Sequence, residues 1–122
     1  MQERRRAPRI EAHLKLELRL PGRQVATLGE TLNISSNGVY FRTEYFMAES
    51  TKLPIIIHLP AAAGAAAALL RPEGIVVRCI PEEEDPSVDT YEVACFFLEI
   101  AENDQQKLNQ FLAERMRAAN PG

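Results

Sequence analysis

The stretch Asn33-Ile34-Ser35-Ser36-Asn37-Gly38 runs directly into Val39-Tyr40-Phe41-Arg42, and the fold is best worked out from it. Its short polar side chains hydrogen-bond to nearby backbone groups and favour tight turns. Gly38 supplies a position that tolerates a positive φ or the close approach of a ligand, and the β-branched and aromatic residues after it favour a strand. The pattern predicts a turn between two strands. Polar turns that end in glycine are common, so by itself the stretch also fits a purely structural hairpin.

Residues 12–20 carry a second clear pattern, a strict alternation of apolar and polar side chains. A period of two predicts a strand with one buried face, and it outweighs the helical propensity of leucine because it cannot form a helical stripe. Pro21-Gly22 predicts a turn, and residues 24–32 predict a second strand in which Gly29 indicates a bulge. The residues expected to face the core from the first strand are Leu14, Leu16, Leu18 and Leu20.

Further strand-like segments follow the polar turn. They are residues 39–44, 53–59, 74–80 and 90–98. The alanine-rich residues 61–68 are expected to form a loop, because Gly64 interrupts a run too short to be a stable helix. The acidic residues 82–85 are expected to lie in a solvated loop.

The C-terminal segment predicts a helix. Asn103 is a suitable N-cap, and Gln106 completes the spacing of a capping box. Apolar residues then recur at the helical period; those expected on the buried face are Leu108, Phe111, Leu112 and Met116. Six short strands followed by one helix are typical of a small antiparallel barrel.

The charge of the chain is unevenly distributed. The 122 residues, enough for one domain, carry a net charge of −3. Four of the 14 lysines and arginines nevertheless lie between positions 4 and 9, far from the acidic residues 82–85. A local basic cluster on an acidic protein suits a small anion better than a long polyanion. We therefore expect no nucleic-acid polymer as a partner.

The chain shows no sign of a membrane or secreted protein. Its N-terminus is charged and lacks the apolar core of a signal peptide. No apolar run approaches the roughly 20 residues that span a bilayer, so we expect no membrane insertion and a cytoplasmic location. Cys79 and Cys95 lie in apolar strand-like runs and are expected to be buried free thiols. A disulfide between them remains possible if their strands are neighbours, and the sequence does not decide this.

Two segments together resemble the PilZ domain family. Arg5-Arg6-Ala7-Pro8-Arg9 is similar to its Arg-x-x-x-Arg element, and residues 33–38 are similar to its Asp/Asn-x-Ser-x-x-Gly element. The second element lies at the usual distance after the first two strands, and Asn33 stands where many members have Asp. The resemblance implies a six-stranded antiparallel PilZ-type β-barrel with a C-terminal α-helix. It also implies a receptor for the bacterial second messenger cyclic di-GMP.

The resemblance assigns the binding roles residue by residue. Arg5 and Arg9 would contact guanine edges, stack on bases and pair with phosphate, since a guanidinium fork matches the O6 and N7 acceptors of guanine. Arg4 would add a further guanine or phosphate contact, which the family associates with two stacked ligand molecules. Asn33 and Ser35 would hydrogen-bond the second base or the ligand backbone. Gly38 would hold the turn and leave room for the ligand.

The expected organisation is a flexible basic segment at residues 1–10 and a barrel domain with its helix at residues 11–122. The resemblance implies a non-enzymatic receptor that changes conformation on binding and acts on an unidentified protein partner in motility, adhesion or exopolysaccharide production. The alternative is a PilZ-like adaptor that does not bind nucleotide. A barrel for single-stranded nucleic acid is disfavoured by the net charge and by an aromatic content of only 7%.

No catalytic, metal or cofactor site is expected. His13 and His58 lack cysteine or acidic partners at the spacing of metal ligands. Ser35 and Ser36 lie in no arrangement that supplies a nucleophile with a base. The acidic residues 82–85 lack the spaced ligands and the glycine of a calcium loop.

Overall fold

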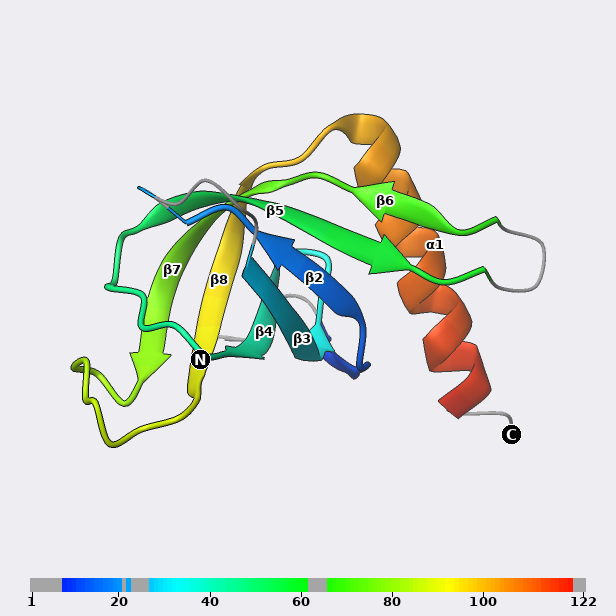
Figure 1. The fold of residues 1–122 in the computed structure, drawn as a ribbon. Coiled ribbons are helices and arrows are strands. Elements are labelled where there is room, and N and C mark those ends of the chain that lie inside the picture. The colour runs from blue at the N-terminus through cyan, green and yellow to red at the C-terminus, as the bar shows by residue number, and fades with distance from the viewer. Residues whose placement is uncertain (1–7, 21, 23–26, 62–65, 120–122) are drawn as a thin grey trace, which may run out of the picture.

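The computed structural model describes residues 8–20, 22, 27–61 and 66–119, and Figure 1 shows how they are arranged. The elements in chain order are β1 (Ile10–Glu11), β2 (Lys15–Leu18), β3 (Thr27–Ile34), β4 (Gly38–Thr43), β5 (Lys52–Leu59), β6 (Ala68–Leu70), β7 (Glu73–Ile80), β8 (Tyr91–Glu99) and α1 (Glu102–Ala119).

Six strands close into an antiparallel barrel. Hydrogen-bonded neighbours follow the order β3–β2–β5–β7–β8–β4, and β4 pairs again with β3. Two short strands are added to this barrel, because β1 also pairs with β3 and β6 pairs with β5. The helix α1 lies along one side, close to β6 in Figure 1, and contacts β1 and β6. The predicted six-stranded antiparallel barrel with a C-terminal helix is confirmed.

The barrel interior is filled by the apolar face of each strand. The alternation predicted for residues 12–20 is correct, because Leu14, Leu16, Leu18 and Leu20 are all buried. Phe41 from β4 and Ile57 from β5 are fully enclosed in the same core. On α1, Leu108, Phe111 and Leu112 are buried as expected. Met116 is 41% exposed, so its predicted place on the buried face is wrong.

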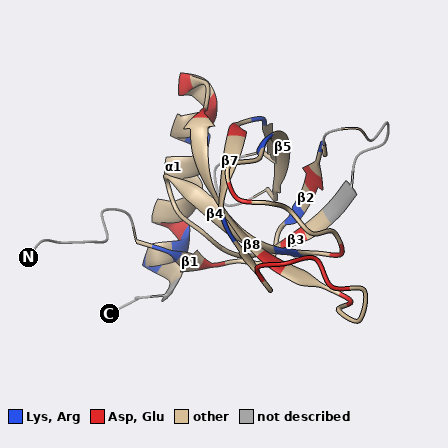
Figure 2. Cartoon of the chain, turned by 90° about the vertical axis from the view of Figure 1, so that its left-hand side faces the viewer, with Lys and Arg blue, Asp and Glu red and all other residues tan. Residues whose placement is uncertain are grey.

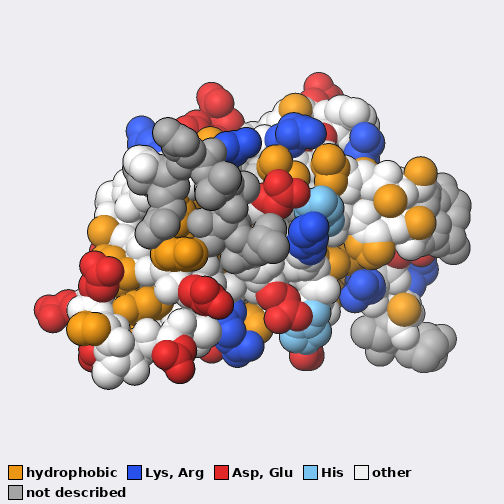
Figure 3. Space-filling model, viewed as in Figure 1, with side chains coloured by type: hydrophobic (Ala, Val, Ile, Leu, Met, Phe, Trp, Pro, Cys, Tyr) orange, Lys and Arg blue, Asp and Glu red, His pale blue; other side chains and the backbone are white. Residues whose placement is uncertain are grey.

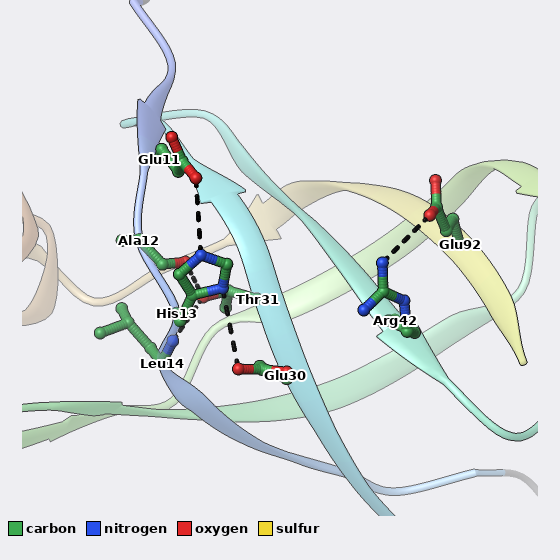
Figure 4. A network of polar contacts seen from close by, with 8 residues as sticks. All are labelled: Glu11, Ala12, His13, Leu14, Glu30, Thr31, Arg42 and Glu92. Carbon is green, nitrogen blue, oxygen red and sulfur yellow. Dashed lines mark hydrogen bonds and ion pairs between the residues drawn. The ribbon is translucent and has the colours of Figure 1, made fainter.

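The first predicted strand is interrupted at residues 12–14, and Thr31 of β3 bridges the interruption (Figure 4). The Thr31 hydroxyl donates a hydrogen bond to the carbonyl oxygen of Ala12 and accepts one of 2.7 Å from the Leu14 N–H. The Thr31 N–H donates to the Leu14 carbonyl oxygen at 2.9 Å. Thr31 therefore satisfies backbone groups that a regular ladder would otherwise pair. It also holds β1 in register on β3, with Ile10 opposite Ile34.

The second predicted strand is shifted along the chain. It was expected at residues 24–32; β3 is Thr27–Ile34, and residues 24–26 lie outside the described part. The bulge predicted at Gly29 is wrong, because Gly29 pairs regularly with Leu16. The irregularity lies between Thr31 and Asn33, where β3 faces β4. A Cβ at Gly29 would lie 3.1 Å from the Arg42 carbonyl oxygen, so a larger residue would be tightly packed against β4 at this position.

Two further local predictions need correction. The alanine-rich loop ends in a short strand, β6, whose Leu70 is fully buried against the core; residues 62–65 of this loop are outside the described part. The helix does not begin with an Asn103 cap, because the Gln105 N–H already donates to the Ala101 carbonyl oxygen at 2.8 Å. Asn103 is therefore inside the first turn, where the neighbouring Asp104 carboxylate accepts a 2.9 Å hydrogen bond from the Arg71 N–H.

Cys79 and Cys95 are buried free thiols, as predicted. They lie on neighbouring strands but are offset along them, since Cys79 pairs with Val93 and Cys95 pairs with Val76. Burial raises the pKa of both thiols, and that of Cys95 rises to about 12 with a smaller contribution from nearby Cys79. As for the membrane, no helix in the described part of the chain has the length and apolar character needed to cross one.

Candidate ligand-binding site

One row of outward-facing residues crosses five adjacent strands. Glu11 pairs with Asn33, Asn33 with Tyr40, Tyr40 with Ala94, and Ala94 with Arg78. Residues that pair across a sheet point to the same face, so these side chains form a line on the outside of the barrel. β4 and β8, which carry the middle of this line, lie near the centre of Figure 2.

A pocket of about 460 Å³ opens over this row. It brings together residues from β3, β4, β7, β8, the turn between β3 and β4, and the segment before β1. They are Arg9, Asn33, Ser35, Asn37, Gly38, Val39, Tyr40, Val77, Arg78, Ala94, Cys95 and Phe96. Four predicted site residues are thus gathered in one place, namely Arg9, Asn33, Ser35 and Gly38. Arg4 and Arg5 lie outside the described residues.

Among the described residues, the pocket lining carries positive charge and no carboxylate. Its ionised side chains are Arg9 and Arg78, which come from opposite sides of the row. Within the described part of the chain, neither guanidinium forms an ion pair. The acidic residues 82–85 are in the loop between β7 and β8 (Figure 2) and do not line the pocket. An anion is therefore favoured here although the chain as a whole is acidic.

The turn formed by residues 33–38, here called the motif turn, is closed by its own polar groups. The Ser35 N–H donates to the Gly38 carbonyl oxygen at 2.9 Å. The Ser35 hydroxyl accepts a 3.1 Å hydrogen bond from the Asn37 N–H. Because a serine hydroxyl can accept and donate at once, its proton remains available to a ligand. Ser35 is 9% exposed, so its hydroxyl is held in one orientation by the turn around it.

The motif turn is also tied to the rest of the barrel. The Phe97 N–H of β8 donates to the Asn37 carbonyl oxygen at 2.8 Å. The Gln105 side chain of α1 donates from Nε2 to the Ser36 carbonyl oxygen at 3.3 Å. The turn thus connects the pocket to both β8 and the first turns of the helix.

Gly38 is required by the packing of two strands. It lies in β4 opposite Phe96, and the positive φ that the sequence left open does not occur there, since among the described residues positive φ is found at Gly22 and Ser50. A Cβ on Gly38 would lie 2.2 Å from the Cys95 carbonyl oxygen, far inside van der Waals contact. The glycine therefore lets β4 approach β8 at the mouth of the pocket.

Tyr40 is held in the pocket wall by a short polar chain. Its hydroxyl donates to Glu92 Oε1 at 2.7 Å, and Arg42 Nη2 lies 3.4 Å from Glu92 Oε2. Arg42 and Glu92 are drawn on the right of Figure 4. The hydrogen bond to Glu92, followed by burial, raises the pKa of Tyr40 against the opposing effect of Arg78 and Arg9. The phenol therefore stays neutral and its ring keeps a fixed orientation.

Several lining residues were missed by the sequence reasoning. Arg78 is the one charged residue in the otherwise apolar segment 75–80, and that contrast could have marked it. Phe96 lies between the inward positions Val93, Cys95 and Phe97 of its strand, so the same alternation could have placed it outside. Phe96 is in fact 57% exposed. The position of Tyr40 on the outer face follows in the same way from the burial of Phe41 beside it.

The polar groups in the pocket suit binding of an anion or a base edge. They are guanidinium, amide and hydroxyl groups, which recognise phosphates and nucleobases. No group of three or more potential metal ligands occurs among the described residues. His13 and His58 do have acidic neighbours, and Figure 3 shows red acidic side chains beside the pale blue histidine surface. His13 lies 3.6 Å from Glu11, and His58 lies 2.7 Å from Glu17.

Solved structures with the same fold cover nearly the whole chain. The Bacillus subtilis inhibitor of motility MotI/DgrA has a TM-score of 0.77 at 26% identity, over 98% of this chain and 54% of that one. The PilZ domain of Escherichia coli YcgR, solved with c-di-GMP, has a TM-score of 0.70 at 16% identity, over 98% and 96%. The MrkH–c-di-GMP complex of K. pneumoniae has a TM-score of 0.69 at 18% identity, over 99% and 56%. This chain therefore spans about half the length of MotI/DgrA and of MrkH.

Sequence comparison identifies the family. No curated protein matches the chain in sequence. The model of the PilZ domain matches residues 3–114, a range that contains both the arginine segment at residues 4–9 and the motif turn. Because the match extends over most of the chain and agrees with the observed barrel, the chain belongs to the PilZ domain family.

Proposed function

We propose that this protein is a non-enzymatic, cytoplasmic receptor for cyclic di-GMP. The observation that carries the proposal is the pocket itself, in which Arg9 meets Asn33, Ser35 and Gly38 of the motif turn. In the described part of the lining, two guanidinium groups without a carboxylate beside them suit a ligand with two phosphates. The related PilZ structures of YcgR and MrkH contain c-di-GMP, which supports the same ligand here.

The arginines are proposed to hold the guanine edges and phosphates. A guanidinium fork donates two hydrogen bonds to O6 and N7 of guanine, or pairs with phosphate as a bidentate cation. Arg9 lies at the pocket beside β1, whose register on β3 is held through Thr31. Arg5 is proposed to act with Arg9, and Arg4 to add one further contact.

The motif turn is proposed to supply the neutral contacts. Asn33 lines the pocket and carries both a donor and an acceptor on its side chain. Ser35 keeps a hydroxyl proton that it can donate, because the Asn37 N–H already occupies its acceptor side. Asn33 and Ser35 together can bind a second base or the ligand backbone while Gly38 keeps the two strands close.

Binding is proposed to act as a conformational switch. Residues 1–10 would close over the ligand when it binds, and the altered surface would be shown to a protein partner in motility, adhesion or exopolysaccharide production. Amide exchange of this segment with and without cyclic di-GMP tests the switch. We expect greater protection in the complex, and equal protection in the two states would contradict the switch.

A calorimetric and thermal-shift series with cyclic di-GMP, cyclic di-AMP and GTP tests the ligand. Adenine places an N6 donor where guanine has its O6 acceptor, so an arginine fork should discriminate against it. Cyclic di-GMP at a hundredfold excess over its Kd should stabilise the fold by about 2.7 kcal/mol, or several degrees of melting temperature. Equal shifts with all three nucleotides would indicate a plain anion site. No shift with any of them would favour the adaptor that binds no nucleotide.

Matched arginine variants test the site. Arg9→Ala and Arg5→Ala should abolish binding of cyclic di-GMP without lowering the melting temperature of the free protein. Arg71→Ala is the control, since Arg71 is exposed and does not line this pocket. A large loss of stability in Arg9→Ala would show that this arginine is structural.

Arg4 is proposed to determine the stoichiometry. With Arg4 present we expect two stacked molecules of cyclic di-GMP per chain, and with Arg4→Ala we expect one. Calorimetry measures the number directly. A stoichiometry of one for the wild type would contradict this role of Arg4.

A further inference from the structure

We infer that Arg78 and Phe96 form a second recognition wall, outside both sequence motifs, that holds one nucleobase of the ligand by stacking it on Phe96 with its polar edge toward Arg78. This inference rests on the proposed function, because it concerns how the same pocket reads its ligand. Arg78 comes from β7 and Phe96 from β8, on the side of the pocket away from Arg9.

A bulge in β7 places Arg78 in the pocket. The pairing of β7 with β8 passes from Val76–Cys95 directly to Arg78–Ala94, so Val77 is left without an opposite residue. Val76 is buried, and strict alternation would therefore turn Arg78 inward. The extra residue lets both Val77 and Arg78 point outward before Cys79 returns to the core. Bulges of this kind commonly re-aim a side chain beside a functional site.

The surroundings of Arg78 leave its guanidinium available. Its neighbour across the strand pair is Ala94, whose small side chain leaves open space between Arg78 and Tyr40. No carboxylate among the described residues pairs with Arg78. On the same face, the Glu92 carboxylate contacts the Tyr40 hydroxyl and the Arg42 guanidinium. Arg78 is thus a cation in the pocket lining with no ion-pair partner in the described part of the chain.

Phe96 offers a flat apolar surface beside this cation. It is the most exposed of the large hydrophobic residues in the described chain, at 57%. Its partner on β4 is Gly38, which has no side chain to cover the ring on that side. Nucleobases stack on exposed aromatic rings of this kind regardless of sequence. The base would then present O6 and N7 to a nearby guanidinium if it is guanine.

The spacing of the two walls suits a ligand with two bases. Arg78 and Asn33 belong to the same row but are separated by three strand-to-strand steps, about 14 Å measured along the sheet. Side chains at this separation can bind different parts of one extended ligand. A cyclic dinucleotide can place one base near the motif turn and the arginine segment, and the other against Phe96 and Arg78. The β7–β8 wall would thus contribute to the preference for two guanines.

Binding measurements on Arg78→Gln and Phe96→Ala test the wall. Their controls are Arg71→Gln and Leu98→Ala, because Arg71 and Leu98 are exposed and do not line this pocket. We expect each pocket variant to raise the Kd for cyclic di-GMP at least tenfold, with unchanged melting temperatures, and each control to bind as the wild type does. Arg78→Gln should also reduce the preference for cyclic di-GMP over cyclic di-AMP. Phe96→Ala should weaken the binding of both.

A spectroscopic variant reports the stacking directly. The chain contains no tryptophan, so Phe96→Trp introduces a single indole at the wall and Leu98→Trp a matched one outside it. Cyclic di-GMP should quench the fluorescence of the first and leave that of the second unchanged. If the wild type binds, Arg9→Ala does not, and the wall variants still bind with wild-type affinity and no quenching, the inference is wrong. If the wild type binds none of the nucleotides, the proposed function fails and the inference fails with it.

Discussion

The Thr31 hydroxyl should be a large contributor to stability for its size. Thr31→Val keeps the shape of the side chain but removes the acceptor for the Leu14 N–H and the donor to the Ala12 carbonyl oxygen. Thr31, Ala12 and Leu14 are all buried, so water cannot replace these partners. Each unsatisfied group costs about 1–3 kcal/mol, which gives a loss of about 2–4 kcal/mol after partial relaxation. For a domain of this size that is a fall of about 8–16 °C in melting temperature.

Thr43→Val is the matched control for this experiment. Thr43 is also buried on a barrel strand, but its Oγ1 has no hydrogen-bond partner among the described residues. The same substitution there removes a desolvated hydroxyl and should leave stability unchanged or slightly higher. Urea denaturation of both variants gives the two free energies of unfolding. Similar losses in both, or none in Thr31→Val, would refute the bridging role of the Thr31 hydroxyl. Thr31→Val should also weaken the binding of cyclic di-GMP. Thr31 holds β1 in register on β3, and Arg9 directly precedes β1, so a looser β1 would position Arg9 less well.

Three other expected outcomes follow from single contacts. Gly38→Ala should destabilise the fold by about 1–3 kcal/mol through overpacking against the Cys95 carbonyl oxygen, and an unchanged melting temperature would contradict this. The hydrogen bond with His58 lowers the pKa of Glu17. Ionised Glu17 therefore stabilises the fold above the ordinary carboxyl pKa, and this stabilisation is lost as the pH falls through the lowered pKa. Urea denaturation should show Glu17→Gln to be less stable than the wild type near neutral pH, with a smaller difference below about pH 4. Burial raises the pKa of Cys79 and Cys95. Neither thiol should therefore react with a thiol reagent at about pH 8 until the chain unfolds. Fast labelling of the folded protein would show that a thiol is accessible and contradict this.

The strands and the helix could be predicted from the sequence, because the patterns that indicate them depend only on residues close together in the chain. Alternation at residues 12–20 identified which side chains of the first strand are buried, and all four leucines are in the core. Of the four apolar residues that the helical period placed on the buried face of α1, three are buried and Met116 is exposed. Two of the errors occurred at element ends. Asn103 has the residue type of a cap, but the helix begins one residue earlier, and the strand β6 is too short to carry a pattern of its own.

Part of the candidate site could likewise be predicted from the sequence, and part could not. The two motifs are short and contiguous, so the sequence alone marked Arg9, Asn33, Ser35 and Gly38, which the barrel then brings to one pocket. The sequence marked Gly38 as a turn or ligand-approach position, but it did not show that the glycine is needed for the close packing of β4 on β8. Its neighbour Cys95 is distant in sequence, and no local rule shows that the Cys95 carbonyl oxygen occupies the space of a side chain.

The sequence by itself determined the strand pattern, the helix and the two motifs of this protein, because hydrophobic period and motif spacing are properties of neighbouring residues. Only the tertiary structure decided that Arg78 and Phe96 share the pocket with those motifs. Whether Arg78 points outward depends on which residue of β7 is left unpaired against β8, and here it is Val77. The register of β7 on β8 determines which residue is unpaired, and this register depends on contacts between residues far apart in the chain.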